Sequence, residues 1–258
     1  MKRILLKIAY DGANFKGWQN GKNSRSVEET INNTLTELLK EKIKIFGVSR
    51  TDSGVHANCN YATFDTNIDI VPDKIYFAIN DLLPRDISIL ESKEVSMDFD
   101  VKHHDFIKTY IYRIHNAKIR NPLKEHNAYF CYYDIDLNKL KEAAKYLIGK
   151  HNFISFINPN SQTLTNAKER GQNLDELTIR EIYDIEIKKI DDIIEIKYIG
   201  SGFMYQMVRI MTGTILKAGM NMIKPIDIID IMNKKNRKFA GLTLPGHGLT
   251  LENIEFRE

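Results

Sequence analysis

The chain has 258 residues, of which 43% are hydrophobic and 28% charged, as in a globular protein with a core of its own. Its net charge of +3 is too small to identify a polyanionic partner by itself, and no apolar run is long enough to cross a membrane or to form a signal peptide. Two cysteines, Cys59 and Cys131, make no disulfide framework and no metal-ligand spacing, so we expect a reducing compartment, the cytoplasm.

The first half of the sequence predicts six elements in the order strand, helix, strand, strand, helix, strand. Ser26 and Glu29 form a capping box, which marks the start of a helix that continues to about Lys40. The predicted ranges are strands at 5–10, 43–48, 61–64 and 87–95, and helices at 26–40 and 72–82. This order is the split βαβ plan of ferredoxin-like folds.

The second half predicts a second, looser set of elements of the same kind. The predicted ranges are strands at 108–115, 179–187, 193–199 and 249–256, and helices at 137–147 and 203–217. The first of these helices ends towards Gly149, a C-cap signal, and the methionine stripe on the second is typical of core packing rather than of a cofactor site. Residues 158–176 are polar and lack periodicity, so we expect a long loop there.

The most informative segment is residues 47–57, which hold Asp52 between an arginine and a Ser-Gly pair. A rigidly held carboxylate beside a guanidinium stays ionised, as a catalytic nucleophile or base requires. Asp-Ser-Gly is also ordinary turn chemistry, so taken alone the segment is compatible with a surface turn. Aspartic proteases carry a similar tripeptide, but they need two such aspartates, and the adjacent Arg50 would oppose the raised pKa of a shared proton.

Basic side chains gather in two places, and in the first they are interleaved with aromatic ones. Such segments suit a nucleic-acid backbone and unstacked bases, although a solvated charged face is an equally good interpretation of each. The first segment contains Lys102, Lys108, Arg113, Lys118, Arg120 and Lys124 with Tyr110 and Tyr112, and the second contains Lys234, Lys235, Arg237 and Lys238.

Residues 50–57 as a whole, Arg-Thr-Asp-Ser-Gly-Val-His-Ala, resemble the Arg-Thr-Asp-x-Gly-Val-His-Ala signature of the tRNA pseudouridine synthase A family. The resemblance continues in order along the chain. It is carried by Tyr10-Asp11-Gly12, Phe15, Gly17-Trp18-Gln19, Ser26-Val27-Glu28-Glu29, Lys108-Thr109-Tyr110 with Tyr112, Phe153 with Ser155-Phe156, Phe203 with Met207-Val208-Arg209 and Gly213, and Gly248-Leu249 with Leu251.

The resemblance implies a fold and an activity. The fold is α+β, with two ferredoxin-like halves that share one continuous, mostly antiparallel sheet and an active-site cleft between them. We assign residues 1–104 to the half that carries the catalytic Asp and 105–258 to the half that carries the Tyr and Arg. The implied activity is isomerisation of uridine to pseudouridine at positions 38, 39 and 40 of the tRNA anticodon stem-loop, by a cytoplasmic homodimer without metal or cofactor.

The resemblance also assigns roles to individual residues. Asp52 matches the catalytic carboxylate, and the sequence leaves open whether it attacks C1′ of the ribose or removes the C2′ proton. Tyr110 matches the side chain that stacks on the flipped-out base, and Arg209 matches the basic partner of the Asp, with a structural ion pair as the alternative. Arg50, two residues before Asp52, would fill the space that the base vacates. Lys102 would grip a phosphate.

The sequence departs from the family pattern at three places near these residues. Ser49 stands where the family usually has Gly, Lys102 where Arg is common, and Asn58-Cys59-Asn60 replaces the usual segment. None of them changes Asp52, Tyr110 or Arg209, so they bear on fine substrate choice rather than on activity. The alternative to an enzyme is a catalytically silent protein that binds or folds tRNA on the same scaffold.

Overall fold

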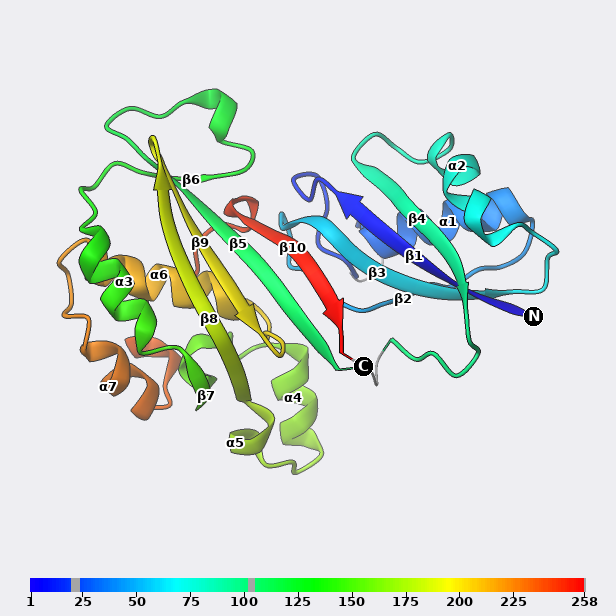
Figure 1. Cartoon of the computed structure of the whole chain (residues 1–258). Coiled ribbons are helices and arrows are strands. Elements are labelled where there is room, and N and C mark those ends of the chain that lie inside the picture. Colours follow the sequence, from blue (N-terminus) through cyan, green and yellow to red (C-terminus); the bar gives the residue numbers. More distant parts are fainter. Residues whose placement is uncertain (20–23, 102–104, 258) are drawn as a thin grey trace. The chain divides into compact units, whose positions relative to one another are not determined.

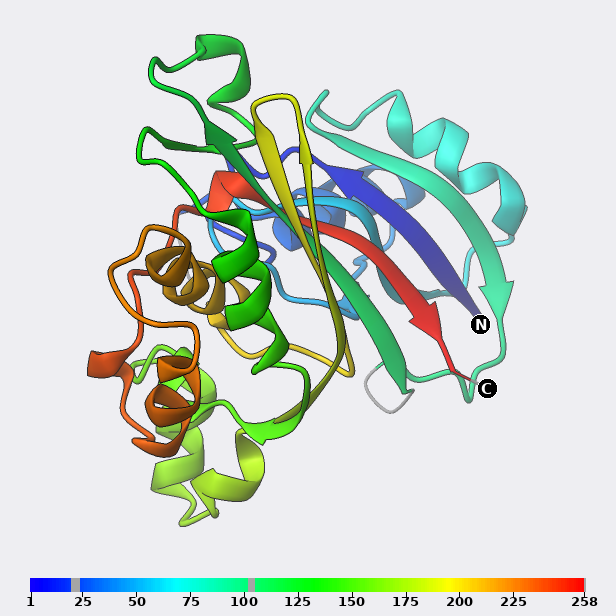
Figure 2. The ribbon, with the colours of Figure 1, turned by 60° about the vertical axis from the view of Figure 1, so that its left-hand side comes forward.

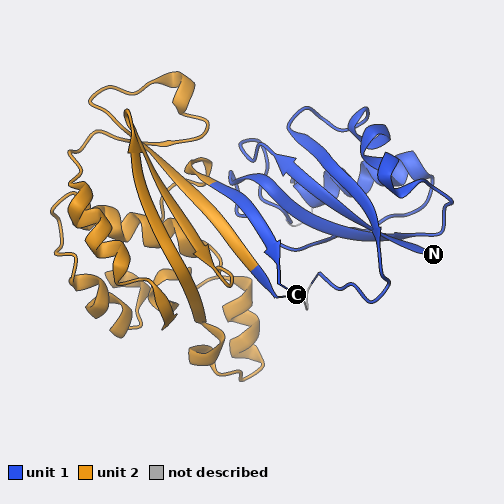
Figure 3. Ribbon diagram, in the orientation of Figure 1, with its two compact units in different colours: residues 1–106, 250–258 blue, residues 107–249 orange. Residues whose placement is uncertain are grey.

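The computed structural model describes residues 1–19, 24–101 and 105–257, and the chain divides into two compact units. Unit 1 comprises residues 1–106 and 250–258, and unit 2 comprises residues 107–249 (Figure 3). The predicted seam at 104/105 lies close to this division, but residues 250–258 belong with unit 1 rather than with the second half. The reason is strand pairing, because Thr250 and Leu251 lie opposite His56 and Ala57 in a parallel ladder.

Unit 1 has the predicted order of strands and helices (Figure 1). Its strands are β1 (Lys2–Tyr10), β2 (Phe46–Gly47), β3 (His56–Thr66), β4 (Ile87–Val95) and β10 (Leu249–Phe256), and its helices are α1 (Val27–Leu39) and α2 (Ile75–Asn80), with a 3-10 turn at Pro72–Lys74. The sheet order is β4-β1-β3-β10, and β2 adds to β3. Antiparallel pairing of β1 with both β3 and β4 makes β1 the central strand of the split βαβ unit.

Local sequence signals explain these elements. Ser26 caps α1 by accepting a hydrogen bond from the Glu29 backbone N–H at 3.3 Å, as the capping box predicts. Alternate residues of β1, such as Ile4 and Leu6, are completely buried, and so is Ile31 on the inner face of α1. One face of the sheet and one face of the helix therefore build the core of unit 1.

Unit 2 packs helices against a second, mostly antiparallel set of strands (Figures 1 and 2). Its strands are β5 (Phe106–Asn116), β6 (Tyr129–Cys131), β7 (Gly149–Asn152), β8 (Ile179–Ile190) and β9 (Ile193–Gly200), in the order β5-β9-β8-β7 with β6 parallel to β5. Its helices are α3 (Leu137–Lys145), α4 (Gln162–Glu169), α5 (Leu174–Leu177), α6 (Met207–Gly219) and α7 (Asp227–Asn233). Short 3-10 turns cover Pro122–Lys124, Ile154–Phe156, Arg237–Phe239 and Gly246–Gly248.

Helix α6 forms the centre of the core of unit 2. Met207 and Met211 are completely buried, which confirms that the methionine stripe is core. The helix is anchored to the sheet where the hydroxyl groups of Tyr198 in β9 and Thr212 lie 2.9 Å apart. Helix α3 contacts both α6 and β8, so it covers the same face of the sheet.

Three sequence-based expectations in unit 2 were wrong. Residues 158–176 contain α4 and α5, because Ser161 and Asn173 cap these short helices and Leu164 is buried against the unit. Helix α6 begins at Met207 rather than at residue 203, because Gln206 adopts a left-handed conformation (φ 60°). Gly149 begins β7 and caps no helix, since α3 already ends at Lys145. The short strands β6 and β7 and helix α7 were not predicted.

The mixed α+β fold with mostly antiparallel pairing is confirmed. Over the described ranges, the structure contains no helix with the length and apolar character needed to cross a bilayer.

Candidate active site

Asp52 lies in a tight turn of residues 52–55, which we call the Asp52 turn. The Val55 backbone N–H donates to the Asp52 carbonyl at 3.2 Å, and Gly54 has a φ of 77°. This left-handed conformation is open to glycine at no steric cost, which explains the glycine at this position. Arg50 is exposed, Thr51 is buried and Asp52 is half-buried, so successive side chains point alternately to solvent and to the core just before the turn.

Residues 10–18, which we call the platform, are joined to the Asp52 turn and to Thr51 by hydrogen bonds. The Trp18 N–H donates to the Thr51 carbonyl at 3.0 Å, and the Gly54 N–H donates to the Phe15 carbonyl at 3.2 Å. Phe15 and Trp18 are each 1% exposed, so the hydrogen bonds sit on a rigid core. The Tyr10 hydroxyl group lies 2.7 Å from Thr51 Oγ1, which fixes the residue next to Asp52 from the end of β1.

Two glycines of the platform allow the two backbones to come this close. A Cβ atom on Gly12 would lie 2.0 Å from the Val55 carbonyl oxygen, and one on Gly17 would lie 2.8 Å from the Thr51 carbonyl oxygen. Neither position can hold a side chain unless the Asp52 turn moves. The opening motif of the sequence is therefore the structural support of the Asp52 segment.

Asn60 supports the other side of the same segment. Its side chain is completely buried, accepts from the Ser49 backbone N–H at 3.3 Å and donates to the Ser49 carbonyl at 2.9 Å. Ser49 and Asn60 are two of the departures from the family pattern, and the structure shows that they form one unit. These paired hydrogen bonds between a side-chain amide and a backbone hold the chain before Asp52, as the platform holds the chain after it.

The exposed Arg50 acts electrostatically on Glu28 in the first turn of α1. Burial raises the pKa of the Glu28 carboxyl group, and the positive charges of Arg50 and Lys44 oppose that shift. His56, which follows the Asp52 turn, is placed by the platform, with its Nδ1 3.1 Å from the Gly12 nitrogen and 3.0 Å from Asp11 Oδ1.

In unit 2, Tyr110 lies on the inner face of β5. It is 7% exposed, sits opposite Tyr198 of β9, and meets the Phe203 ring edge to face with 5.4 Å between ring centroids. Phe203 reaches this place because residues 203–206 precede α6 instead of continuing it. The irregular start of α6 thus sets the orientation of the Tyr110 ring.

Arg209, on the first turns of α6, is oriented by the segment that follows Gly241. Its Nε donates to the Leu244 carbonyl at 2.6 Å. Helix and segment approach closely, because a Cβ atom on Gly213 would lie 2.1 Å from the Leu242 carbonyl oxygen. Burial raises the pKa of Tyr112 well above its usual value and the charge of Arg209 opposes this shift, so the guanidinium group lies near β5.

Two further cations are partly buried in unit 2. Burial, together with the positive charge of Arg180, lowers the pKa of Lys108 to about 8, and burial lowers the pKa of Arg180 as well. Arg180, which follows the segment that was expected to be a loop, was not among the predicted site residues. Arg180 is the second residue of β8, and nothing in the sequence around it indicates that its side chain is partly buried.

Ion pairs account for much of the charge in the two basic segments. Lys118 pairs with Asp134 and Arg113 with Glu195, while Lys235 of the second segment pairs with Asp175. Further contacts join Lys124 to Asp192, Arg120 to Glu125, and the Lys234 ammonium group to the ring of Phe239. These pairs favour a solvated charged face over a bare cationic surface for the exposed members.

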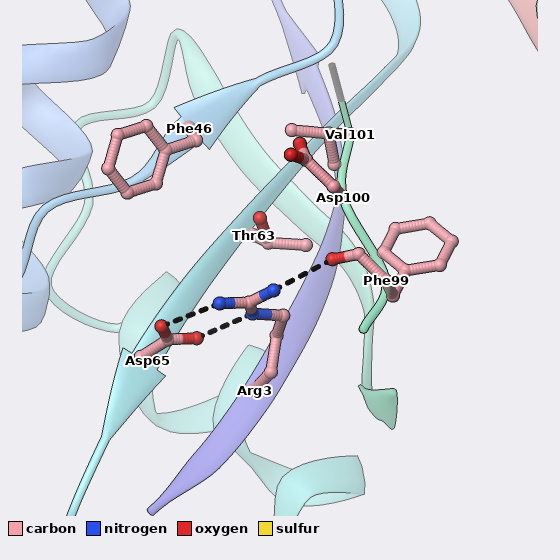
Figure 4. A pocket seen from close by; sticks show the side chains of 7 residues that line it. All are labelled: Arg3, Phe46, Thr63, Asp65, Phe99, Asp100 and Val101. Atoms are coloured by element: carbon pink, nitrogen blue, oxygen red, sulfur yellow. Dashed lines mark hydrogen bonds and ion pairs between the residues drawn. The ribbon is translucent and has the colours of Figure 1, made fainter. Parts of the chain in front are cut away.

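A pocket of about 140 Å³ in unit 1 is structural (Figure 4). It is lined by Arg3, Phe46, Thr63, Asp65, Phe99, Asp100 and Val101. The Arg3 guanidinium group binds both oxygens of Asp65 at 2.7 and 2.8 Å and also donates to the Phe99 carbonyl at 2.9 Å, as Figure 4 shows. These bonds lower the pKa of Asp65 and tie the cation to the chain.

The structure thus places the expected site residues in both units. Asp52 and Arg50 belong to unit 1, and Tyr110 and Arg209 to unit 2. Lys102 lies outside the described residues. No group of three or more acidic, His or Cys side chains among the described residues could hold a metal ion.

The chain matches a family model described as tRNA pseudouridine synthase, over residues 7–104 and 143–257. It is 39% identical to "tRNA pseudouridine synthase A 2" of Clostridium tetani over 255 residues, which cover 98% of each chain. It is 36% identical to "tRNA pseudouridine synthase A" of Acetivibrio thermocellus and 37% identical to that of Clostridium acetobutylicum, in each case over 99% of this chain and 100% of the relative.

The close contact at Gly17 makes a first prediction. Gly17→Ala forces the platform and the Asp52 turn apart, so we expect the free energy of unfolding to fall by about 2 kcal/mol or more. The single tryptophan, Trp18, adjoins the altered residue and reports the change. Its fluorescence should shift to longer wavelength and become accessible to acrylamide.

Gly171→Ala is the matched control. Gly171 also has a positive φ (64°), but nothing lies within 4 Å of the position that its Cβ atom would take. This change should cost about 1 kcal/mol of backbone strain and leave Trp18 fluorescence as it is. Equal effects of the two substitutions on Trp18 would contradict the proposed support of the Asp52 turn by Gly17.

The lowered pKa of the partly buried Lys108 gives a second prediction. Because the pKa of Lys108 is about 8 in the folded protein and higher in the unfolded chain, the unfolded chain binds more protons between these values. The free energy of unfolding of the wild type should therefore rise relative to Lys108→Met as the pH increases from about 8 to about 10. Denaturant titrations at several pH values measure this difference.

Ile111→Val on the same strand is the control, since it changes packing without removing a titratable group. Its stability difference from the wild type should stay constant over the same pH range. A difference between the wild type and Lys108→Met that is equally constant would show that Lys108 titrates alike in the folded and unfolded chains.

Proposed function

The chain belongs to the tRNA pseudouridine synthase family, and we propose that it isomerises uridine to pseudouridine at positions 38, 39 and 40 of the tRNA anticodon stem-loop. The family match covers most of both units, and relatives named for this activity align over nearly the whole chain. The observation that carries the proposal is the Asp52 turn, in which the backbone on both sides of the half-buried Asp52 is hydrogen-bonded to the platform.

Asp52 is the proposed catalytic carboxylate. The reaction breaks the bond between N1 of uracil and C1′ of the ribose. C5 of the same uracil then bonds to C1′ and loses its proton, while N1 gains a proton. A carboxylate next to the ribose can attack C1′ or remove the C2′ proton, and both routes remain open. Both need a carboxylate that keeps its position while the base rotates, and the fixed backbone on each side of Asp52 supports that role.

Tyr110 and Arg209 are the proposed substrate-binding residues of unit 2. A base within a helix or stacked loop must leave its stack to react, and the ring of Tyr110, held by Phe203, is suited to stack on it. Arg209, whose Nε donates to the Leu244 carbonyl, would keep Asp52 ionised.

Arg50 and Lys102 complete the proposed site. Arg50 is exposed two residues before Asp52, where it can enter the space that the flipped base leaves. Lys102 would contact a phosphate of the RNA. We also propose that the protein acts in the cytoplasm as a homodimer and needs neither metal nor cofactor.

The role of Asp52 gives a third prediction. Asp52→Ala should abolish pseudouridine formation on anticodon stem-loops that carry uridine at position 38, 39 or 40, because it removes the reacting carboxylate. Binding should weaken much less, since phosphate contacts supply most of the affinity for RNA. Chemical mapping of pseudouridine in the product RNA and a filter-binding titration measure the two effects.

Asp69→Ala is the control, because this aspartate of unit 1 has a fully exposed carboxylate. Its activity should equal that of the wild type. Product formed by Asp52→Ala would refute the catalytic role of Asp52. Wild-type protein that binds all three RNAs and modifies none would instead identify a silent tRNA-binding protein.

A further inference from the structure

Asn60 of β3 holds the chain at the residue before Arg50. Strand β2 runs antiparallel to β3, and the Val48 N–H extends this pairing by donating to the Tyr61 carbonyl at 2.8 Å. At the next residue, Ser49, the Asn60 side chain binds both backbone groups. Its Oδ1 accepts from the Ser49 N–H at 3.3 Å, and its Nδ2 donates to the Ser49 carbonyl at 2.9 Å.

The position of the Asn60 amide is closely defined. The side chain is completely buried, and its Oδ1 also accepts from the Tyr61 N–H at 2.9 Å. A buried carboxamide group that lost these partners would leave its own polar atoms and those of the backbone unpaired, which destabilises the fold. Ser49, which is 5% exposed, is therefore bound by a group that cannot move away without breaking several hydrogen bonds at once.

Arg50 is held on its other side as well. Thr51 is 7% exposed, its carbonyl accepts from the Trp18 N–H at 3.0 Å, and its Oγ1 lies 2.7 Å from the Tyr10 hydroxyl group. Arg50 itself is exposed. Its backbone is therefore anchored at both neighbours, Ser49 and Thr51, while its side chain reaches the solvent.

An anchored backbone matters for a side chain that has to replace a base. A base that leaves a helix gives up its pairing and stacking, and a side chain that enters the gap compensates for part of this loss. Each backbone residue that is still flexible before the reaction has to be ordered during it, which reduces the compensation. The loss is greatest for a paired base and least for a mismatched one, so a fixed Arg50 should help most with a paired uridine.

We propose that Asn60 is a positioning residue for Arg50, and that it promotes the flipping of uridines that are paired within a stem. By fixing Ser49, Asn60 presents the Arg50 guanidinium group to the RNA from a backbone that is already ordered. This inference rests on the proposed function, since that function gives Arg50 a base to replace. A purely structural bond would instead stabilise unit 1 without affecting paired and mismatched targets differently.

The test uses two anticodon stem-loops, one with the target uridine opposite adenine and one with it opposite cytosine, each with 2-aminopurine next to the target. Asn60→Leu removes the amide at nearly constant size. At saturating protein concentration, it should slow pseudouridine formation about tenfold on the paired target and about twofold or less on the mismatched one. The dissociation constant of either RNA should change less than about threefold, since phosphate contacts supply most of the affinity.

Arg50→Ala shows whether Asn60 acts through Arg50. In protein that already carries Arg50→Ala, the further change Asn60→Leu should slow the reaction on the paired target by less than about twofold, because the side chain to be positioned is absent. Asn60→Ser keeps a hydroxyl group that can bond one of the two Ser49 groups. It is the second variant if melting curves show that Asn60→Leu is poorly folded.

The chain offers a matched control in Asn80, the last residue of α2. Its amide makes the same pair of hydrogen bonds, both at 2.8 Å, to the N–H and carbonyl groups of Ile89 in β4. Asn80→Leu should lower the melting temperature but modify both RNAs at the wild-type rates.

Three outcomes would overturn the inference. In the first, folded Asn60→Leu protein modifies both RNAs at the wild-type rates. In the second, it is slowed equally on both RNAs. In the third, Asn60→Leu slows the Arg50→Ala protein as much as it slows the wild type.

The fluorescence of 2-aminopurine, which rises when its neighbour leaves the stack, separates this inference from the proposed function. Wild-type protein that raises the fluorescence but forms no product would refute the proposed function. A smaller rise with Asn60→Leu on the paired RNA alone would then leave the role of Asn60 in place. Wild-type protein that gives neither signal would refute both.

Discussion

The contact between two stretches of backbone, the platform and the segment that ends in the Asp52 turn, is the constraint on which unit 1 depends. Hydrogen bonds from Trp18 and Gly54 join the two stretches directly, without long side chains between them. Backbone groups have no rotamers to lose, so this contact defines the position of Asp52 with little loss of side-chain entropy. The requirement for glycine at positions 12 and 17 follows from the same contact.

Unit 2 orients its proposed site residues in a different way, through side chains packed on a sheet. The ring of Tyr110 is set by Phe203, and the guanidinium group of Arg209 is set by a carbonyl of the segment after Gly241. Both depend on where α6 begins. Gln206, in a left-handed conformation, precedes the first residue of α6, so Phe203 lies outside the helix when it packs against Tyr110.

Much of unit 1 was predictable because its signals are local. The capping box of Ser26 and the alternation in β1 each lie within a few residues of the structure that they specify. The turn at Gly54 is local in the same sense. The return of residues 250–258 to unit 1 was not predictable, because it depends on pairing between Thr250 and His56, about 200 residues apart. Helices α4 and α5 were missed because they are too short to show a period and are fixed mainly by their caps.

The ion pairs of the candidate site were likewise not predictable from local sequence. The sequence locates every lysine and arginine but not the carboxylates that face them, so Lys118 and Arg180 look alike until the chain is folded. Folding places Lys118 beside Asp134 at the surface, where the pair contributes little to binding or stability. It places Arg180 beside the carbonyl groups of Leu177 and Ile179, which orient its guanidinium group without neutralising it. Which cations are neutralised by an ion pair is therefore decided by the folded chain, rather than by their clustering in the sequence.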